Sequence, residues 1–214
     1  MLKQDDIRTQ REAWFIECAR VLLDEHGYEG MSMSGLAEST SFTKRTLYQY
    51  FKNKREVYLA VVGADLLELE GELRGAVEAG ETGREKYLAI LGAFLGFVRQ
   101  RPQAYERIHA FEEHDFHLDR PLEREDVHLS GCIEIHHRIT RLTLGLIEEG
   151  QRDASISSDR ASTEIMLGVW AAMVGVIRVV GVRRDQLGDR YSTSVDAMYE
   201  MLMGMISCVL DGEV

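Results

Sequence analysis

The sequence predicts an all-α protein, in which short helices near the N-terminus are followed by a longer helical region. Apolar residues recur at i, i+3 and i+4 along the chain, and no window alternates apolar and polar residues as a half-buried strand does. Only two prolines, Pro102 and Pro121, interrupt this pattern. The chain has 214 residues, 45% of them hydrophobic, which is enough for one or two modest domains.

The first helix is expected to begin near Asp5 or Asp6 and to end in the segment HGYEG. Gly27 in that segment can adopt the left-handed conformation that closes a helix. One face of this helix carries a set of apolar residues, Phe15, Cys18, Ala19 and Leu22. We therefore expect the helix to pack through that face.

A second helix of about two turns is expected after Ser32, whose hydroxyl can cap it. Met31 and Leu36 are spaced as the two halves of a hydrophobic staple around this cap. Two further caps follow closely, Thr43 for a third helix that runs to about Tyr50, and Asn53 with Glu56 for a fourth. The sequence thus predicts a helix, a short turn and a second helix.

Beyond this region, helical periodicity covers residues 84–101, 102–114, 122–150, 161–181 and 192–210. The segment QRDASISSDR, residues 151–160, is expected to be a connecting loop. We divide the chain into an N-terminal domain, residues 1–58, and a larger helical domain, residues 59–214.

Composition indicates a soluble cytoplasmic protein. The three cysteines, Cys18, Cys132 and Cys208, are widely spaced and lack a C-x-x-C pair, which favours neither disulfides nor a cysteine zinc site. The charged N-terminus lacks the pattern of a secretory signal. The longest apolar run, residues 165–177, is shorter than the roughly 20 residues of a membrane span.

The charge distribution marks the N-terminal domain as different from the rest. The net charge is −11, yet residues 1–58 contain nine Lys/Arg and nine Asp/Glu, so the whole excess lies beyond residue 58. Residues 40–58 hold five Lys/Arg against one Asp/Glu. An acidic total argues against nucleic acid as a partner, whereas this small basic region is compatible with it.

The stretch SFTKRTLYQYF, residues 41–51, carries the chemistry of a DNA reader. On a helix that begins at Lys44, the residues Leu47 and Phe51 share the inward face. Lys44 with Tyr48, and Arg45 with Gln49, form outward rows at i, i+4 spacing. Arginine can bind guanine and glutamine can bind adenine, while lysine, threonine and tyrosine can hold phosphates.

Residues 7–58 resemble the N-terminal domain of the TetR family of bacterial transcriptional regulators, and LAESTSFTKRTLYQYFKNKREVYLAVV is similar to the signature segment of that family. The resemblance implies packing roles for Leu36 and Ala37 and a turn role for Phe42. The DNA contacts that we expect are Ser32, Thr43, Lys44, Arg45, Thr46, Tyr48, Gln49, Tyr50 and Lys54. Ser41 stands where the family usually has glycine, and Gly35 where an acidic residue is common.

The resemblance also implies a homodimer, since two recognition helices about 34 Å apart would read successive major grooves. A stripe of small residues and a heptad-like seam are the candidates for the dimer interface: Gly168, Ala171, Ala172, Gly175, Val195, Met198, Leu202, Met205 and Val209. Burial inside one chain is the alternative explanation of the same pattern.

A ligand-responsive regulator, most simply a repressor that binds a palindromic operator and is released by a small molecule, needs an effector pocket. The candidate lining residues are aromatic and apolar with one histidine: Phe94, Phe97, Phe111, Phe116, His137, Trp170 and Met173. Such residues at helical spacing are more often plain core. No cofactor is expected.

Two alternatives remain open, a helical interaction protein and a metal-responsive regulator. His109 and Glu113 are spaced at i, i+4, and other ligand types lie nearby, namely His114, Asp115, His117, His136 and His137. A solvated acidic helix end is the commoner reading of this pattern. We find no G-x-S-x-G, phosphate-cradling glycine loop or H-E-x-x-H, so an enzyme is not expected.

Overall fold

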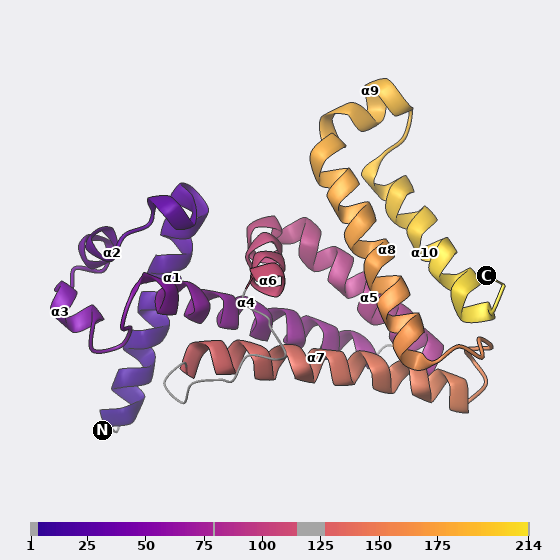
Figure 1. The fold of residues 1–214 in the computed structure, drawn as a ribbon, viewed down its shortest axis with the longest axis horizontal. Helices are drawn as coiled ribbons and strands as arrows, with labels where there is room; N and C mark the ends of the chain where they lie inside the picture. Colours follow the sequence, from indigo (N-terminus) through magenta and orange to yellow (C-terminus); the bar gives the residue numbers. More distant parts are fainter. Residues whose placement is uncertain (1–3, 79, 115–126, 214) are drawn as a thin grey trace. The chain divides into compact units, whose positions relative to one another are not determined.

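The computed structural model describes residues 4–78, 80–114 and 127–213, and these form helices joined by turns, with no strand among them (Figure 1). The prediction of an all-α protein is confirmed. The chain divides into two compact units: residues 1–70 with 98–137 are unit 1, and residues 71–97 with 138–214 are unit 2. The long helices α4 (Lys54–Val77), α5 (Gly83–Gln100) and α7 (Val127–Arg152) contribute residues to both units.

Unit 1 begins with α1 (Gln4–Gly30), which is interrupted at Gly27. This glycine has φ 67° and ψ 176°, a conformation that side-chain-bearing residues rarely adopt. The helical course is broken where the sequence predicted the end of the first helix. The change of direction at this residue sets the position of Tyr28, which is important below.

The second helix, α2 (Met33–Thr40), is capped as predicted. The amide of Gly35 donates to Ser32 Oγ at 3.0 Å, and Met31 and Leu36 are both buried, as a hydrophobic staple requires. The helix closes at Ser41, which has φ 58° and ψ 23°. Because a non-glycine residue pays for positive φ, Ser41 stores a small strain in the turn.

The third helix, α3 (Lys44–Leu47), is shorter than the helix to Tyr50 that the sequence suggested. Thr43 caps it, since the amide of Thr46 donates to Thr43 Oγ1 at 3.2 Å. After Leu47 the backbone tightens: the amides of Gln49 and Tyr50 donate to residues three positions earlier, at 3.1 and 2.9 Å. This 3₁₀-type geometry ends the α-helix about one turn before Tyr50, but the backbone remains helical up to that residue.

The opening of α4 confirms the cap-plus-acid pair. The amide of Glu56 donates to Asn53 Oδ1 at 3.0 Å, and the amide of Lys52 donates to Glu56 Oε2 at 2.6 Å. Both side chains satisfy amides that a helix start leaves without partners.

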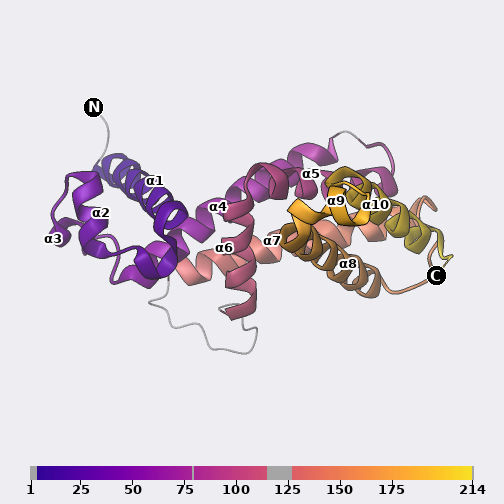
Figure 2. The same ribbon diagram turned by 90° about the horizontal axis from the view of Figure 1, so that it is seen from above.

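A single apolar cluster holds these elements together, and Figure 2 shows α1, α2 and α3 grouped at one end of unit 1. Phe15 is fully buried, with the rings of Phe42 and Tyr50 edge-on to it at 5.2 and 5.1 Å. The other buried members include Ala19, Leu36, Leu47, Phe51 and Val57. The inward face predicted for Leu47 and Phe51 is therefore confirmed.

Unit 1 is completed by the end of α5, by α6 (Pro102–His114) and by the first part of α7. The buried residues of α6 are spaced as one helical face, Ala104, Tyr105, Arg107, Ile108 and Phe111. An arginine among them is unusual, because charged side chains are almost never buried without a partner.

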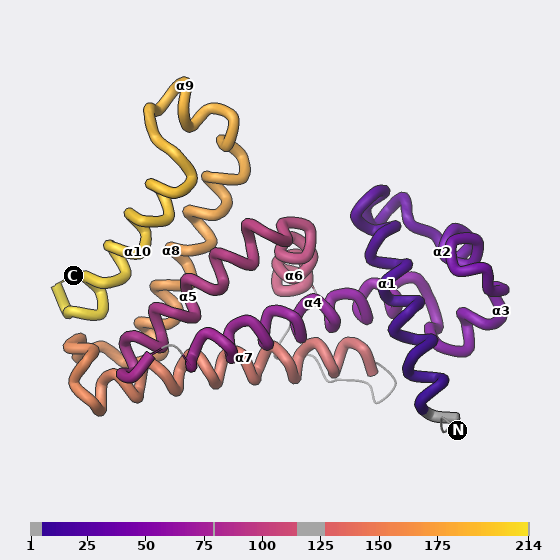
Figure 3. Tube along the Cα trace, turned by 180° about the vertical axis from the view of Figure 1, so that it is seen from behind, coloured from indigo at the N-terminus to yellow at the C-terminus, as the bar shows by residue number. Residues whose placement is uncertain are grey.

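Unit 2 contains the pair α8 (Ser162–Arg183) and α10 (Val195–Asp211), which lie side by side in Figure 3. Between them are a 3₁₀ turn (Arg184–Gln186) and a short helix, α9 (Leu187–Tyr191), neither of which was predicted. The loop after α7 was predicted, and hydrogen bonds fix it to α5. The amide of Gly83 donates to Asp153 Oδ2 at 2.8 Å, and that of Arg84 to Ser155 Oγ at 3.1 Å.

The segment Ser162–Tyr191 is long and apolar enough to cross a membrane by length and composition alone, although the apolar run in the sequence suggested otherwise. Core helices of soluble proteins have the same composition, but here only 28% of the segment's most apolar window is buried. An apolar helix with so much exposed surface needs a cover in water.

Candidate nucleic-acid interface

The recognition segment, residues 43–50, presents most of its polar side chains to solvent. Thr43, Lys44, Arg45 and Gln49 are exposed, and Tyr48 is 51% exposed. Only Leu47 is buried in this segment, and it anchors the segment on the apolar cluster. The outward rows inferred from i, i+4 spacing thus lie on one solvent-facing surface.

Two of the predicted DNA contacts are held partly inside the protein. The ring of Tyr50 packs edge-on against Phe15, and the guanidinium of Arg8 lies 5.4 Å from the Tyr50 ring centre. Lys54 Nζ donates to the backbone oxygen of Glu29 at 3.2 Å. An ammonium group has three donors, so Lys54 can hold a phosphate as well.

The two remaining predicted contacts, Ser32 and Thr46, also have side chains that already make hydrogen bonds within the protein. Ser32 is exposed, but its hydroxyl is the α2 cap, and Thr46 is half-buried with its hydroxyl 3.0 Å from that of Thr43. A hydroxyl can donate and accept at once, so capping leaves capacity for a phosphate oxygen.

Arg8 is a cation that sequence reasoning missed. It lies on α1, and besides its contact with Tyr50 it donates a long hydrogen bond of 3.5 Å to the backbone oxygen of Gln49. The two residues are 41 positions apart, so no local pattern could have revealed the contact. Arg8 adds a positive charge beside the end of the recognition segment.

A buried ion-pair network, formed by Arg20, Asp24, Asp65 and Arg107, ties α1, α4 and α6 together behind this surface. The side chain of Asp65 is fully buried and accepts from Arg107 Nε at 2.7 Å. Arg20 Nη2 lies 3.4 Å from the second oxygen of Asp65, and Arg107 also pairs with Asp24. Burial raises the pKa of Asp65, and the hydrogen bond from Arg107 opposes that rise.

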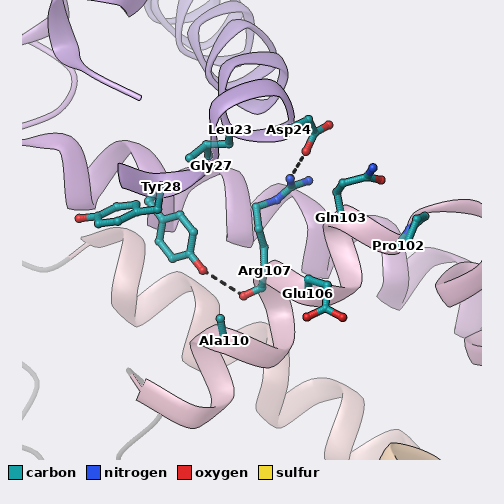
Figure 4. Close-up of a pocket in the computed structure, with 10 residues that line it drawn as sticks. Leu23, Asp24, Gly27, Tyr28, Pro102, Gln103, Glu106, Arg107 and Ala110 are labelled. Carbon is teal, nitrogen blue, oxygen red and sulfur yellow. Dashed lines mark hydrogen bonds and ion pairs between the residues drawn. The ribbon is translucent and has the colours of Figure 1, made fainter. Parts of the chain in front are cut away.

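A cavity of about 450 Å³ lies beside this network, still within unit 1 (Figure 4). Its walls come from α1, α4 and α6, and the lining residues are Leu23, Asp24, Gly27, Tyr28, Tyr58, Pro102, Gln103, Glu106, Arg107 and Ala110. None of the described residues that were predicted to form an effector pocket lines this cavity.

Those predicted pocket residues divide between the two units. Phe94 and Trp170 of unit 2 are in ring contact at 5.3 Å, and Phe97 and Met173 of the same unit are buried. Phe111, buried, and His137, half-buried, belong to unit 1, while Phe116 lies outside the described residues. The pocket remains a prediction.

The predicted dimer residues do not share one environment. Gly168, Ala171, Gly175 and Met205 are exposed, whereas Ala172, Val195, Met198 and Val209 are half-buried. Leu202 is 0% exposed. It belongs to the face of α10 that packs inside unit 2, together with Tyr199, Ile206 and Leu210, so it has no surface to offer a partner.

Two histidines of the predicted cluster, one on α6 and one on α7, pair with carboxylates of α6. His136 Nε2 is 3.1 Å from Glu112 Oε1, and His109 Nε2 is 3.5 Å from Glu113 Oε1. Asp115 and His117 lie outside the described residues. Among the residues that are described, no three His, Cys, Asp or Glu side chains are arranged to hold a metal ion.

The fold and this surface define a helical protein with an N-terminal helix-turn-helix domain. Residues 15–61 match the family model of bacterial regulatory proteins, tetR family, so the helix-turn-helix domain of this chain is of the TetR type. This match confirms the resemblance inferred from the recognition segment. The family consists of DNA-binding regulators, in agreement with the expectation that the chain is not an enzyme.

The chain is similar in sequence to one transcriptional regulator and in fold to two others. It is 29% identical over 101 residues to the HTH-type transcriptional activator FasR of Mycolicibacterium smegmatis; the match spans 47% of this chain and 46% of that protein. A TetR-like transcriptional regulator from Rhodococcus sp. RHA1 has a TM-score of 0.62 at 20% identity, covering 99% and 100% of the two chains. FadR from Bacillus subtilis, in complex with stearoyl-CoA, has a TM-score of 0.66 at 12% identity, covering 92% and 97%.

Proposed function

We propose that this protein is a homodimeric transcriptional regulator of the cytoplasm that binds a palindromic operator and leaves it when a small molecule binds. The observation that carries the proposal is the exposed row of Lys44, Arg45, Tyr48 and Gln49 on a capped, core-anchored segment. A helix-turn-helix reader needs this arrangement to place side chains in a major groove.

Within that surface we assign two kinds of contact. Arg45 and Gln49 are the candidates for base edges, because guanidinium and amide groups can make bidentate contacts with guanine and adenine. Ser32, Thr43, Lys44, Thr46, Tyr48, Tyr50 and Lys54 are candidates for backbone contacts, which position the protein without reading sequence.

A second copy is the cover that we propose for the apolar face of α8 and α10. Leu167 is 61% exposed and Met205 54% exposed, with Gly168, Ala171 and Gly175 on the same two-helix element. Small residues allow the backbones of two helices to approach closely. The interface proposed here keeps Met205 and the α8 glycines, and replaces Leu202 by the exposed Met201.

We propose that the effector acts through the spacing of the two DNA-binding heads. The ion pairs of Arg107 with Asp65 and Asp24 fix α6 to α4 and α1, so a shift of α6 would move the helix that carries Phe15 and Arg8. The direction that we expect is repression, although the relative from M. smegmatis is an activator. The stearoyl-CoA bound by the B. subtilis protein makes acyl-CoA thioesters the first compounds to try.

The test of DNA binding is selection from a random duplex pool by the full-length protein at near-physiological salt, with competitor DNA present. Enrichment of an inverted repeat is the expected result, because a two-fold dimer reads two half-sites. Protein that is folded and effector-free but enriches no sequence would overturn the proposal. Binding that competitor DNA abolishes would favour the alternative of an interaction protein with a generic basic patch.

The test of effector control is reciprocity. If a compound weakens operator binding by a given factor, the operator must weaken binding of that compound by the same factor. Stearoyl-CoA is titrated into the protein with and without the selected operator duplex, and a matched non-operator duplex is the control. Equal affinities in both titrations would exclude control by that compound.

Whether the regulator represses or activates is read by transcription in vitro from a promoter carrying the selected site. Repression predicts fewer transcripts as protein is added, and the effector restores them. More transcripts on addition of protein would assign it the activating role instead.

A further inference from the structure

We infer that the cavity between α1, α4 and α6 is a second ligand site, built for an apolar organic cation. It is distinct from the effector pocket predicted from the sequence, since none of the described residues of that prediction lines it: Phe94, Phe97, Phe111, His137, Trp170 and Met173. The volume of about 450 Å³ falls within the roughly 300–1,000 Å³ of small-molecule sites. All of its lining residues belong to unit 1.

The walls of the cavity are apolar and aromatic. The rings of Tyr28 and Tyr58 meet edge to face with centres 5.2 Å apart, and Leu23, Pro102 and Ala110 supply aliphatic surface. The Tyr58 hydroxyl donates to the backbone oxygen of Arg107 at 3.2 Å, which fixes the orientation of that ring (Figure 4). The positive φ of Gly27 turns the chain so that Tyr28 joins this wall.

The charges of the lining favour a cation over an anion. Among the described lining residues Arg107 is the one Lys or Arg, and its guanidinium is already engaged by the buried carboxylate of Asp65 and by Asp24. Glu106, exposed on α6, has no hydrogen bond or ion pair with another described residue. A carboxylate with no partner among the described residues, beside an apolar wall, attracts a positive group, while an anion would find no available cation among these ten residues.

The aromatic wall already binds a cation on one side. Lys54 Nζ lies 4.4 Å from the centre of the Tyr28 ring, within the distance at which the ring quadrupole attracts positive charge. Tyr28 thus already attracts a cation, and we assign the tyrosine surface on the cavity side to the positive group of a ligand. An aryl or alkyl ammonium compound combines this group with the apolar body that the remaining walls require.

Occupation of the cavity would join two parts of the protein. A ligand there contacts Asp24 and Tyr28 at the end of α1, and Gln103 and Glu106 on α6, beside the ion pairs that connect the two helices. Such a compound would hold α6 against the DNA-binding head. This regulatory consequence rests on the proposed function, whereas the binding site itself does not.

The experiment is an NMR titration of the full-length protein, without DNA, with three probes of similar shape: benzyltrimethylammonium, its neutral isostere neopentylbenzene and the anion phenylmethanesulfonate. Probes this small should bind in about the millimolar range. Only the cation is expected to shift the amide signals of Gly27 and Tyr28. Equal shifts with the neutral isostere, or shifts confined to unit 2, would overturn the inference.

Variants locate the site. Glu106→Gln is expected to weaken the ammonium probe about tenfold, because it removes the charge without changing shape. Ala110→Leu fills the cavity and should abolish binding, and thermal unfolding verifies that this variant is folded. Glu113→Gln, two turns further along α6 and outside the lining, is the matched control and should bind normally. If Glu106→Gln and Glu113→Gln behave alike, the assignment of the site is wrong.

This readout separates the inference from the proposed function. Binding is measured without operator, so a failed operator selection leaves the titration valid. Conversely, if an operator is enriched but the ammonium probe does not bind, the proposed function as a regulator is supported and the proposed second ligand site is refuted.

Discussion

The recognition segment and the buried ion-pair network of unit 1 use the same kinds of side chain in opposite environments. Lys44 and Arg45 are exposed to solvent and lie outside the apolar core. Arg107 and Asp65 are buried, where each charge depends on the other. Charged residues that are exposed to water can therefore bind a partner molecule. Charged residues in the core must pair with each other, and these pairs hold the helices together.

The largest loss of stability is expected when the buried ion pair between Arg107 and Asp65 is broken. Arg107→Leu leaves the carboxylate of Asp65 buried without its main partner, which should cost about 3–5 kcal/mol of unfolding free energy. Urea denaturation at pH 7 measures it. The double variant with Asp65→Leu is the control and should recover part of the loss, because the uncompensated charge is gone. A single variant as stable as wild type would show that water or Arg20 satisfies Asp65.

The recognition segment should respond in the opposite way, losing DNA binding and keeping stability. Arg45→Ala or Gln49→Ala should each cost about 1–3 kcal/mol on the selected operator and relax base preference at one position. Lys54→Ala should weaken all sequences alike and lower the salt dependence. Binding isotherms on operator and non-operator duplexes test this. Three unchanged affinities would refute the assignment of these residues to DNA contacts, while the match of residues 15–61 to the family model would stand.

Residues that support the recognition segment without contacting DNA bases are an intermediate case. They lie beside the segment in the sequence, but their effect, like that of the network, is on stability. Thr43→Ala removes the α3 cap and should cost about 1 kcal/mol. Ser41→Gly relieves the positive φ of the turn and should stabilise the protein by about 0.5–1 kcal/mol. Thermal unfolding of both variants, with Ser39→Gly as the control inside α2, distinguishes strain relief from a general effect of glycine.

The smallest effect is expected from exposed carboxylates in unit 2. Hydrogen bonds from the amide of Gly83 and from Ser155 hold the pKa of Asp153 below its ordinary value, and Arg84 does the same for the pKa of Asp211. Their contribution to stability is present above the unfolded pKa and is lost as pH falls through the lower folded pKa, below about pH 4. Asp153→Asn should flatten the acid side of a Tm-against-pH curve. An unchanged slope would show that solvent screens the pair.

These contrasts explain what could be predicted from sequence. The caps at Ser32, Thr43 and Asn53 and the inward face of Leu47 depend on neighbours within four residues, so local chemistry reveals them. The network does not have this property, because Arg107 meets Asp65 across 42 residues and Asp24 across 83. The contact of Arg8 with the recognition segment was missed for the same reason.

Two other errors have local causes. The helix predicted to Tyr50 ends at Leu47, because tightening to i+3 hydrogen bonds leaves the apolar spacing unchanged and is invisible to periodicity. The heptad-like seam predicted on α10 combined residues from two faces of the helix, since Leu202 is buried while Met205 is exposed. A heptad-like spacing of apolar residues does not show which of two partners, α8 or a second copy, covers each position.

The division of the chain into units has a consequence for its modularity. The domain boundary predicted at residue 58 stays a prediction. The compact unit that holds residues 1–58 also contains residues 59–70 and 98–137, and α4 continues past residue 70 to Val77. Exchange of the head between regulators, by recombination or in the laboratory, would therefore have to carry α6 and the start of α7 with it. A transplant cut at residue 58 would leave Arg20 and Asp24 on the new protein without Asp65 and Arg107.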